Sequence, residues 1–292
     1  MGLRFNNKMN NSKLFKGLFL AIVVLPVASG LVYAFLFSLG IIGVLNKGFH
    51  WDVWQTVLFD KPFWVSFGYS LYVALLSVAI SLSVALTIAL SWQKKLQKGL
   101  LSNVIYLPLC FPATVMAFFS FQLLAKSGLL SRIGYQLGFI KEINDFPVLI
   151  KDAYGMGIIF TSVLLITPFF IILFSNLYQS EKIASYVNLA KTLGASNRQI
   201  LQKVMVPILL KRASITIYLF VIFVMGSYEV PLLLGRQNPQ MISVAVLQKI
   251  QRFNLYDMPQ GYAMSMLYVL LIMLILLIIY IKNSNLFKTQ NS

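Results

Sequence analysis

Charged residues, cysteine and histidine are all scarce in this chain of 292 residues. Only 11% of the residues are charged, whereas 59% are hydrophobic. A soluble domain carries about a quarter charged residues, because it needs them to cover its surface. The composition therefore excludes a soluble globular enzyme and indicates an integral membrane protein.

The single cysteine, Cys110, and the single histidine, His50, limit the chemistry that the chain can perform. One cysteine allows neither an internal disulfide nor a cysteine-based metal site. The sequence also has no G-x-x-x-x-G-K-[ST] phosphate-binding loop. We therefore predict no catalytic site, no metal site and no cofactor in this chain.

Six apolar stretches are long enough to cross a membrane, which takes about 20 residues per helix. Five of these six stretches contain no charged residue. The exception is the stretch at residues 214–234, which contains only Glu229. They are residues 17–44, 66–92, 103–125, 154–178, 214–234 and 261–281. Prolines at positions 26, 108, 112, 168 and 231 fall within or at the ends of these stretches. Each is either a functional kink or simple packing geometry.

The first stretch has a second interpretation, a cleaved signal peptide. Its uncharged run from Gly17 to Val44 is longer than the apolar core of about 7–15 residues in such a peptide. No cleavage motif follows it. We therefore expect a retained helix and an all-α protein with six transmembrane helices.

The net charge of +16 follows the membrane topology and does not indicate nucleic acid binding. With the N-terminus inside the cell, the inner segments carry fifteen of the 24 basic residues. That bias matches the positive-inside rule. We predict a multi-pass protein of the cell inner membrane with both termini in the cytoplasm.

The inner segment between the fourth and fifth stretches, residues 179–213, is not a plain polar loop. Apolar residues recur every three or four positions, from Ile183 to Val204, which predicts amphipathic helix. Gly194 interrupts this pattern and Pro207 ends it, and Ser196 or Asn197 is positioned to cap the second helix. The expected result is a short helix, a glycine turn and a second helix that enters the fifth span. Such an element either lies on anionic lipid or binds a cytoplasmic partner.

This segment resembles the EAA signature of the permease subunits of binding-protein-dependent ABC importers. The resemblance implies that eight positions couple the chain to a separate ATPase, and we call them the coupling set: Asn188, Leu189, Ala190, Leu193, Gly194, Ala195, Ile200 and Pro207. Ala190, Gly194, Ile200 and Pro207 match the family pattern, whereas Asn188 replaces its Glu and Leu189 its first Ala. Pro108 and Pro112 resemble the proline-rich third span of these permeases, and residues 226–235 resemble the polyamine-type branch.

The resemblance implies a six-helix type I ABC importer permease, an all-α integral membrane fold. It divides the chain into residues 1–62, a five-helix permease core at 63–283 with a coupling helix at about 180–206, and a cytoplasmic tail at 284–292. It implies ABC ATPase subunits, a second permease subunit and an extracytoplasmic solute-binding protein as partners. A heterodimer of permeases is favoured, and a homodimer stays open.

The resemblance implies that the transported solute is a small molecule, with polyamines as one candidate class. Tyr228, Glu229 and Pro231 are the candidate residues of its path. Glu229 either attracts a cationic solute or serves as a structural carboxylate. The alternative function is a self-sufficient secondary transporter, which typically has more spans, internal repeats and ionisable residues near the midplane. A membrane enzyme would need more His, Asp, Glu or Cys within the spans.

Overall fold

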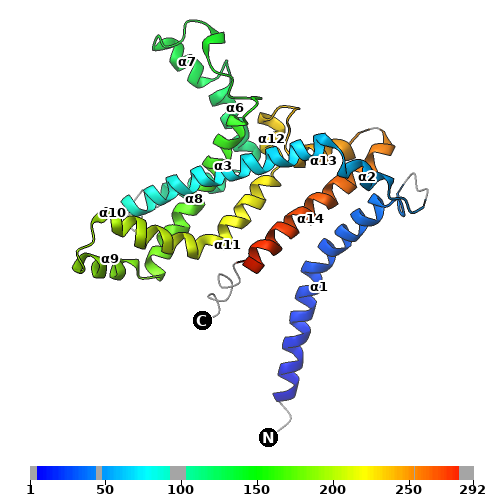
Figure 1. The fold of residues 1–292 in the computed structure, drawn as a ribbon, viewed down its shortest axis with the longest axis horizontal. Helices are drawn as coiled ribbons and strands as arrows, with labels where there is room; N and C mark the ends of the chain where they lie inside the picture. Colours follow the sequence, from blue (N-terminus) through cyan, green and yellow to red (C-terminus); the bar gives the residue numbers. More distant parts are fainter. Residues whose placement is uncertain (1–4, 44–47, 93–102, 253, 283–292) are drawn as a thin grey trace. The chain divides into compact units, whose positions relative to one another are not determined.

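The computed structural model describes residues 5–43, 48–92, 103–252 and 254–282. The predicted tail at 284–292 and the basic residues Lys94, Lys95 and Lys98 lie outside this part. Every long element in the described part is a helix, and no β-strand occurs there (Figure 1). The all-α prediction is confirmed.

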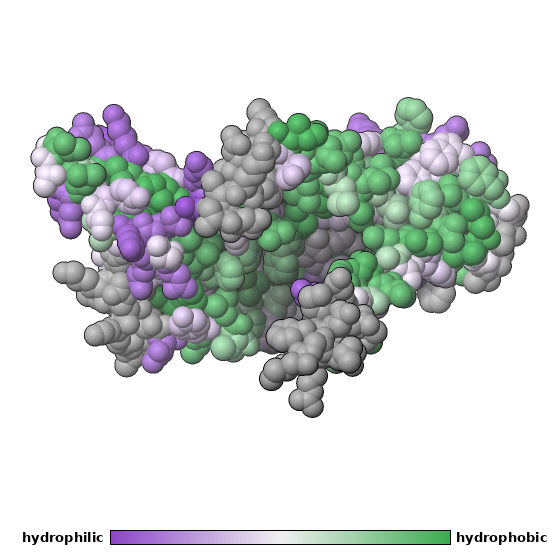
Figure 2. All heavy atoms as spheres, turned by 90° about the horizontal axis from the view of Figure 1, so that it is seen from below, coloured by the Kyte–Doolittle hydropathy of each residue, from purple (hydrophilic) through white to green (hydrophobic). Residues whose placement is uncertain are grey.

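Six helical segments in the described part are long and apolar enough to span a membrane, as expected. The long helices are α1 (Phe5–Ser38), α3 (Lys61–Ser91), α8 (Met156–Ser180), α11 (Val206–Met225) and α14 (Met258–Lys282). The third candidate span combines α6 (Ala113–Leu124) with the short α7 (Leu129–Gln136). Apolar side chains cover much of the face shown in Figure 2, as expected for surfaces in contact with lipid.

The third span begins later than the sequence suggested. We expected it at residues 103–125, but Leu107–Cys110 form a 3-10 turn and α6 begins only at Ala113. Pro112 adopts an extended conformation before the helix, with ψ of 150°. A proline lacks the amide hydrogen of a helical residue and disfavours helix in the residue before it. A search for uncharged stretches cannot detect such a backbone break.

The fifth span is also displaced from the expected residues 214–234. Helix α11 begins at Val206, so Lys211 and Arg212 lie within it, and it ends at Met225. Long basic side chains reach the membrane surface while their stems stay in the apolar region. Glu229 belongs to a separate short helix, α12 (Glu229–Leu234), and is not part of the long fifth helix.

The chain divides into two compact units, which we describe separately. One comprises Met1–Phe63 and Val246–Leu274. Within it, the indole Nε1 of Trp54 in α2 (Asp52–Leu58) donates a hydrogen bond to Ser38 Oγ at 3.1 Å. The rings of Phe37 and Tyr262 lie 4.4 Å apart, which packs α1 against the first turns of α14.

The second unit, Trp64–Ala245 with Ile275–Ser292, contains α6 to α12 and is called here the central unit. Helix α8 lies at its core, with Ile158, Phe170 and Phe174 fully buried. Figure 1 shows α7 and α9 (Ile183–Thr192) at opposite ends of this unit. Helix α8 contacts α6 and α12 within this unit, and it also contacts α9.

Two polar contacts fix the start of α8. The buried carboxylate of Asp152 accepts hydrogen bonds from the backbone amides of Tyr154 and Met156, both at 2.9 Å. The amide of Lys151 donates to the carbonyl of Leu234 at 2.8 Å. The first contact satisfies amides that a helix start leaves unpaired. The second ties the end of α12 to the same point, so α8 determines where α12 lies.

Gly155 is required at the start of α8, for two reasons. Its φ is +69°, and a Cβ there would lie 2.6 Å from the phenol oxygen of Tyr69. We expect Gly155→Ala to destabilise the fold by about 1–3 kcal/mol, the cost of a strained backbone residue. The shift in the thermal unfolding midpoint of the protein purified in detergent measures this.

Gly68→Ala is the matched control for this prediction. Gly68 lies in α3, and a Cβ there meets no atom within 4 Å. This variant should keep the wild-type midpoint or exceed it, because alanine favours helix. Equal midpoints for the two variants would contradict the assigned role of Gly155.

Candidate functional site

The segment that resembles the EAA signature folds as a helix–turn–helix element over residues 183–205. It consists of α9, a turn at residues 193–196, α10 (Asn197–Ile200) and a π-helical turn, Leu201–Met205, that leads into α11. Helix α9 contacts α10 and the π-helical turn, so the chain doubles back on itself. The expected order of helix, glycine turn and second helix is confirmed.

Gly194 and Ser196 determine the shape of the turn. Gly194 has a φ of +80°, in the left-handed region that favours glycine. Ser196 caps α10: its Oγ accepts from the amide of Gln199 at 3.4 Å, and Gln199 Oε1 accepts from the amide of Ser196 at 2.8 Å. This reciprocal arrangement is a capping box. Of the two candidate caps, Ser196 is therefore the one used.

Pro207 does not end the helical pattern, contrary to our expectation. It is the second residue of α11, and the helix continues through it. A proline in this position cannot donate to the carbonyl four residues before it, and its ring crowds that carbonyl. The π-helical turn widens the backbone immediately before Pro207, with the amide of Val206 bonded to the carbonyl of Leu201. That widening accommodates the proline without ending the helix.

The two sides of the element differ sharply in burial. Ile183 and Ile200 are 0% and 2% exposed and anchor the element to the central unit. Tyr186, Leu189 and Leu193 are 52%, 59% and 80% exposed. At 3.6 residues per turn Tyr186 and Leu189 lie on one face of α9, and Leu193, directly after its last residue, continues that face. We call these three residues the apolar stripe.

The structure brings only part of the predicted coupling set to this surface. Leu189 and Leu193 belong to the apolar stripe, and Gly194 is exposed directly after it. Asn188 is exposed on the side of α9 that carries Ala184, four residues earlier. Ala190 and Ala195 are half-buried, and Ile200 is buried, so these three shape the element from inside. Pro207 is exposed at the start of α11.

Three residues in or next to the helix–turn–helix element were not among the predicted site residues. Tyr186 belongs to the stripe, and its spacing of three residues from Leu189 was the signal in the sequence. Glu181 and Arg212 form an ion pair, with Glu181 Oε1 3.0 Å from Arg212 Nε. Its two residues are 31 positions apart, so no local pattern indicated it.

The predicted solute-path residues lie near α12, close to the opposite end of α8. Helix α11 stops at Met225, and residues 226–228 separate it from α12. Glu229 is exposed, Tyr228 is half-buried and Pro231 is buried. Helix α12 packs against α6 and α8. Of the three, Glu229 is therefore the most accessible to a solute.

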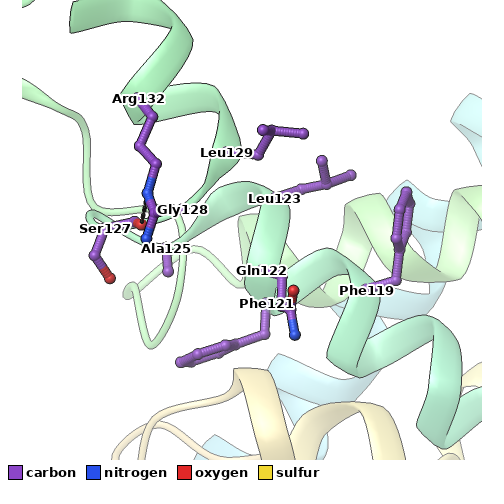
Figure 3. A pocket seen from close by; sticks show the side chains of 9 residues that line it. All are labelled: Phe119, Phe121, Gln122, Leu123, Ala125, Ser127, Gly128, Leu129 and Arg132. Carbon is purple, nitrogen blue, oxygen red and sulfur yellow. Dashed lines mark hydrogen bonds between the residues drawn. The ribbon is translucent and has the colours of Figure 1, made fainter.

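A cavity of about 400 Å³ lies elsewhere in the central unit, at the break between α6 and α7. Phe119, Phe121, Leu123 and Leu129 give it apolar walls, and Gln122 and Arg132 add polar groups. Arg132 turns back to donate from Nε to the Ser127 carbonyl at 3.1 Å (Figure 3). None of Tyr228, Glu229 and Pro231 lines this cavity, so it is separate from the predicted path.

Among the solved structures that are similar to this chain, two cover most of its length. One is described as a bacterial ABC transporter involved in the import of the acidic polysaccharide alginate, with a TM-score of 0.69, 16% identity and 92% of each chain covered. The other is a bacterial alginate ABC transporter in complex with alginate pentasaccharide-bound periplasmic protein, with a TM-score of 0.66, 18% identity and 91% of each chain covered. At such identities the similarity establishes the fold alone.

A search of curated proteins gave no match. The family model for the inner membrane component of binding-protein-dependent transport systems matches residues 77–287, well over half of the chain. This match covers α6 to α12, including the helix–turn–helix element. The chain is thus a multi-pass membrane protein, and it belongs to the family of binding-protein-dependent transport system inner membrane components.

Proposed function

We propose that this chain is the permease subunit of an ATP-driven ABC importer and that the apolar stripe binds a separate ATPase subunit. The observation that carries the proposal is the exposure of Tyr186, Leu189 and Leu193 on a helix that the buried Ile183 anchors. Exposed apolar side chains that gather on one face mark an interaction site. An amphipathic helix that lies in a partner's groove is a common mode of recognition.

The anchoring explains how binding at the stripe would act on the membrane helices. Ile183 and Ile200 hold α9 and α10 to the unit that contains α8 and α11. A displacement of α9 by the ATPase would therefore move the ends of both long helices. A flexible loop would absorb the same displacement. We infer that ATP binding and hydrolysis in the partner alternate the permease between outward-open and inward-open states.

The family and the charge distribution support our proposals for the remaining partners and for the orientation. We infer an extracytoplasmic solute-binding protein and a second permease subunit, with a heterodimer favoured over a homodimer. The basic residues of the helix–turn–helix element, Lys191, Arg198 and Lys203, favour its placement in the cytoplasm. Both termini then face the cytoplasm.

For the solute, we propose a small cation such as a polyamine. The support is the exposed carboxylate of Glu229 at the start of α12. It lies next to residues 226–228, where the backbone is not helical. Breaks of this kind in membrane helices are tolerated where the backbone is buried in protein or lines a water-filled cavity. A carboxylate there would attract a cation.

A charge placed in the apolar stripe should prevent binding of the ATPase. We expect Leu189→Asp or Leu193→Asp to lower the amount of ATPase that co-purifies with the chain by more than about tenfold, as for central residues of an interface. Ala184→Asp is the matched control. Ala184 is exposed on the other side of the same helix, so its variant should retain the ATPase. Normal ATPase recovery with both leucine variants would refute the docking surface.

Substitutions of Gly194 test whether the turn geometry matters for transport. A Cβ at Gly194 meets no atom within 4 Å, so any cost comes from the positive φ alone. We expect Gly194→Val to lose uptake, because a left-handed backbone costs an ordinary residue about 1–2 kcal/mol. Gly194→Asn should keep most uptake, because asparagine tolerates this conformation. Equal uptake by the two variants, with equal amounts of protein in the membrane, would show that transport does not depend on the turn geometry at Gly194.

The role of Glu229 is tested by removing its charge without changing its shape. We expect Glu229→Gln to lower the apparent affinity for putrescine uptake by about two- to fivefold, the range for an exposed ion pair. Glu229→Asp keeps the charge and should retain uptake. Unchanged uptake by the Gln variant at normal protein levels would assign Glu229 a structural role.

A further inference from the structure

We propose that the Glu181–Arg212 ion pair is the positioning contact that makes α8 and α11 respond together to movement of the helix–turn–helix element. This inference rests on the proposed function, because it concerns how the element transmits motion. It assigns no contact with the solute or the nucleotide to either residue. The pair lies at the base of the element, where the chain enters and leaves it.

The ion pair joins the end of α8 to the beginning of α11. Glu181 follows the last residue of α8, and its amide still bonds to the carbonyl of Leu177 at 3.0 Å. Arg212 lies in the second turn of α11. The contact of 3.0 Å between Oε1 and Nε therefore joins the two stems of the element directly. The chain between the two residues holds all of α9, the glycine turn, α10 and the π-helical turn.

The backbone that connects each residue of the pair to the element is irregular. Directly after Glu181, Lys182 takes a left-handed conformation with φ of +49°. Before Arg212, the π-helical turn interrupts the regular hydrogen-bond pattern. Both stems thus join the element through irregular backbone, where bending is easier than within an α-helix. Farther along, α8 and α11 pack directly, with the rings of Phe170 and Phe220 5.0 Å apart. The side-chain bridge adds a link between the two stems next to the irregular segments.

The acidic partner of the pair stands alone in a basic part of the sequence. Glu181 is the one acidic residue in the sequence between Asp152 and Glu229, whereas basic residues are numerous in the same stretch. Its side chain is 26% exposed and that of Arg212 is 40% exposed. Pairs as exposed as this contribute little to folding stability. Removal of the pair should therefore leave the fold intact and change how the two stems move.

The experiment uses the complete complex of this chain with its ATPase, second permease and solute-binding protein, reconstituted in liposomes. The readouts are the amount of ATPase bound and the ratio of ATP hydrolysis with and without the binding protein, purified with the solute it carries from the cell. We expect Glu181→Gln to lower that ratio by about two- to fivefold, with the bound ATPase unchanged. Lys211→Gln, next to Arg212 and exposed, is the matched control and should keep the wild-type ratio.

A charge exchange tests the pair itself. The double variant Glu181→Arg with Arg212→Glu should recover most of the stimulation that Glu181→Gln loses. Arg212→Lys keeps the charge but loses the planar Nε group, so it should give an intermediate ratio. Recovery by the exchange would not follow if either residue acted alone.

Four results would overturn the inference. They are an unchanged ratio in Glu181→Gln, a matching loss in Lys211→Gln, no recovery in the charge exchange, and a parallel loss of bound ATPase. The last would mean that the pair supports docking and does not transmit motion. If the wild-type chain binds no ATPase, the proposed function fails and this inference fails with it. If the leucine variants of the stripe lose the ATPase while Glu181→Gln behaves like wild type, only this inference fails.

Discussion

The hydrocarbon interior of a membrane offers no hydrogen-bond partner to the backbone, and this constraint governs the architecture of the chain. Every segment that spans it must satisfy its own amides and carbonyls, which selects helices. The departures from regular helix are therefore informative. They include the break at Pro112, the π-helical turn before Pro207 and the interruption at residues 226–228. Proline geometry accounts for the irregular backbone at Pro112 and before Pro207.

The two candidate sites of the central unit depend on α8. At one end, Asp152 and the Lys151–Leu234 hydrogen bond fix its start and place α12, which carries Glu229. At the other end, Glu181 and the buried Ile183 connect it to the helix–turn–helix element. A single buried helix thus links the proposed ATPase site to the proposed solute path. In an importer of this family, that link provides a route by which one site can affect the other.

Within the helix–turn–helix element, buried residues support the shape of the element, and exposed residues form the proposed binding surface. Ile183 and Ile200 fill the interior, whereas Tyr186, Leu189 and Leu193 remain exposed. All five are apolar, so composition cannot distinguish the two groups. The distinction arises because α9 and α10 fold back on each other and cover one face of α9 only. Asn188 is exposed on another side of α9 and carries no charge.

The sequence by itself determined the class, the number of spans and the order of helix, glycine turn and helix around Gly194. These follow from local chemistry: uncharged length, apolar spacing and the backbone freedom of glycine. The tertiary structure alone decided where the third and fifth spans begin, that Pro207 continues a helix, and that Glu181 meets Arg212. These outcomes depend on backbone breaks and on contacts between residues far apart in the chain. A local pattern of residue types carries no information about such contacts.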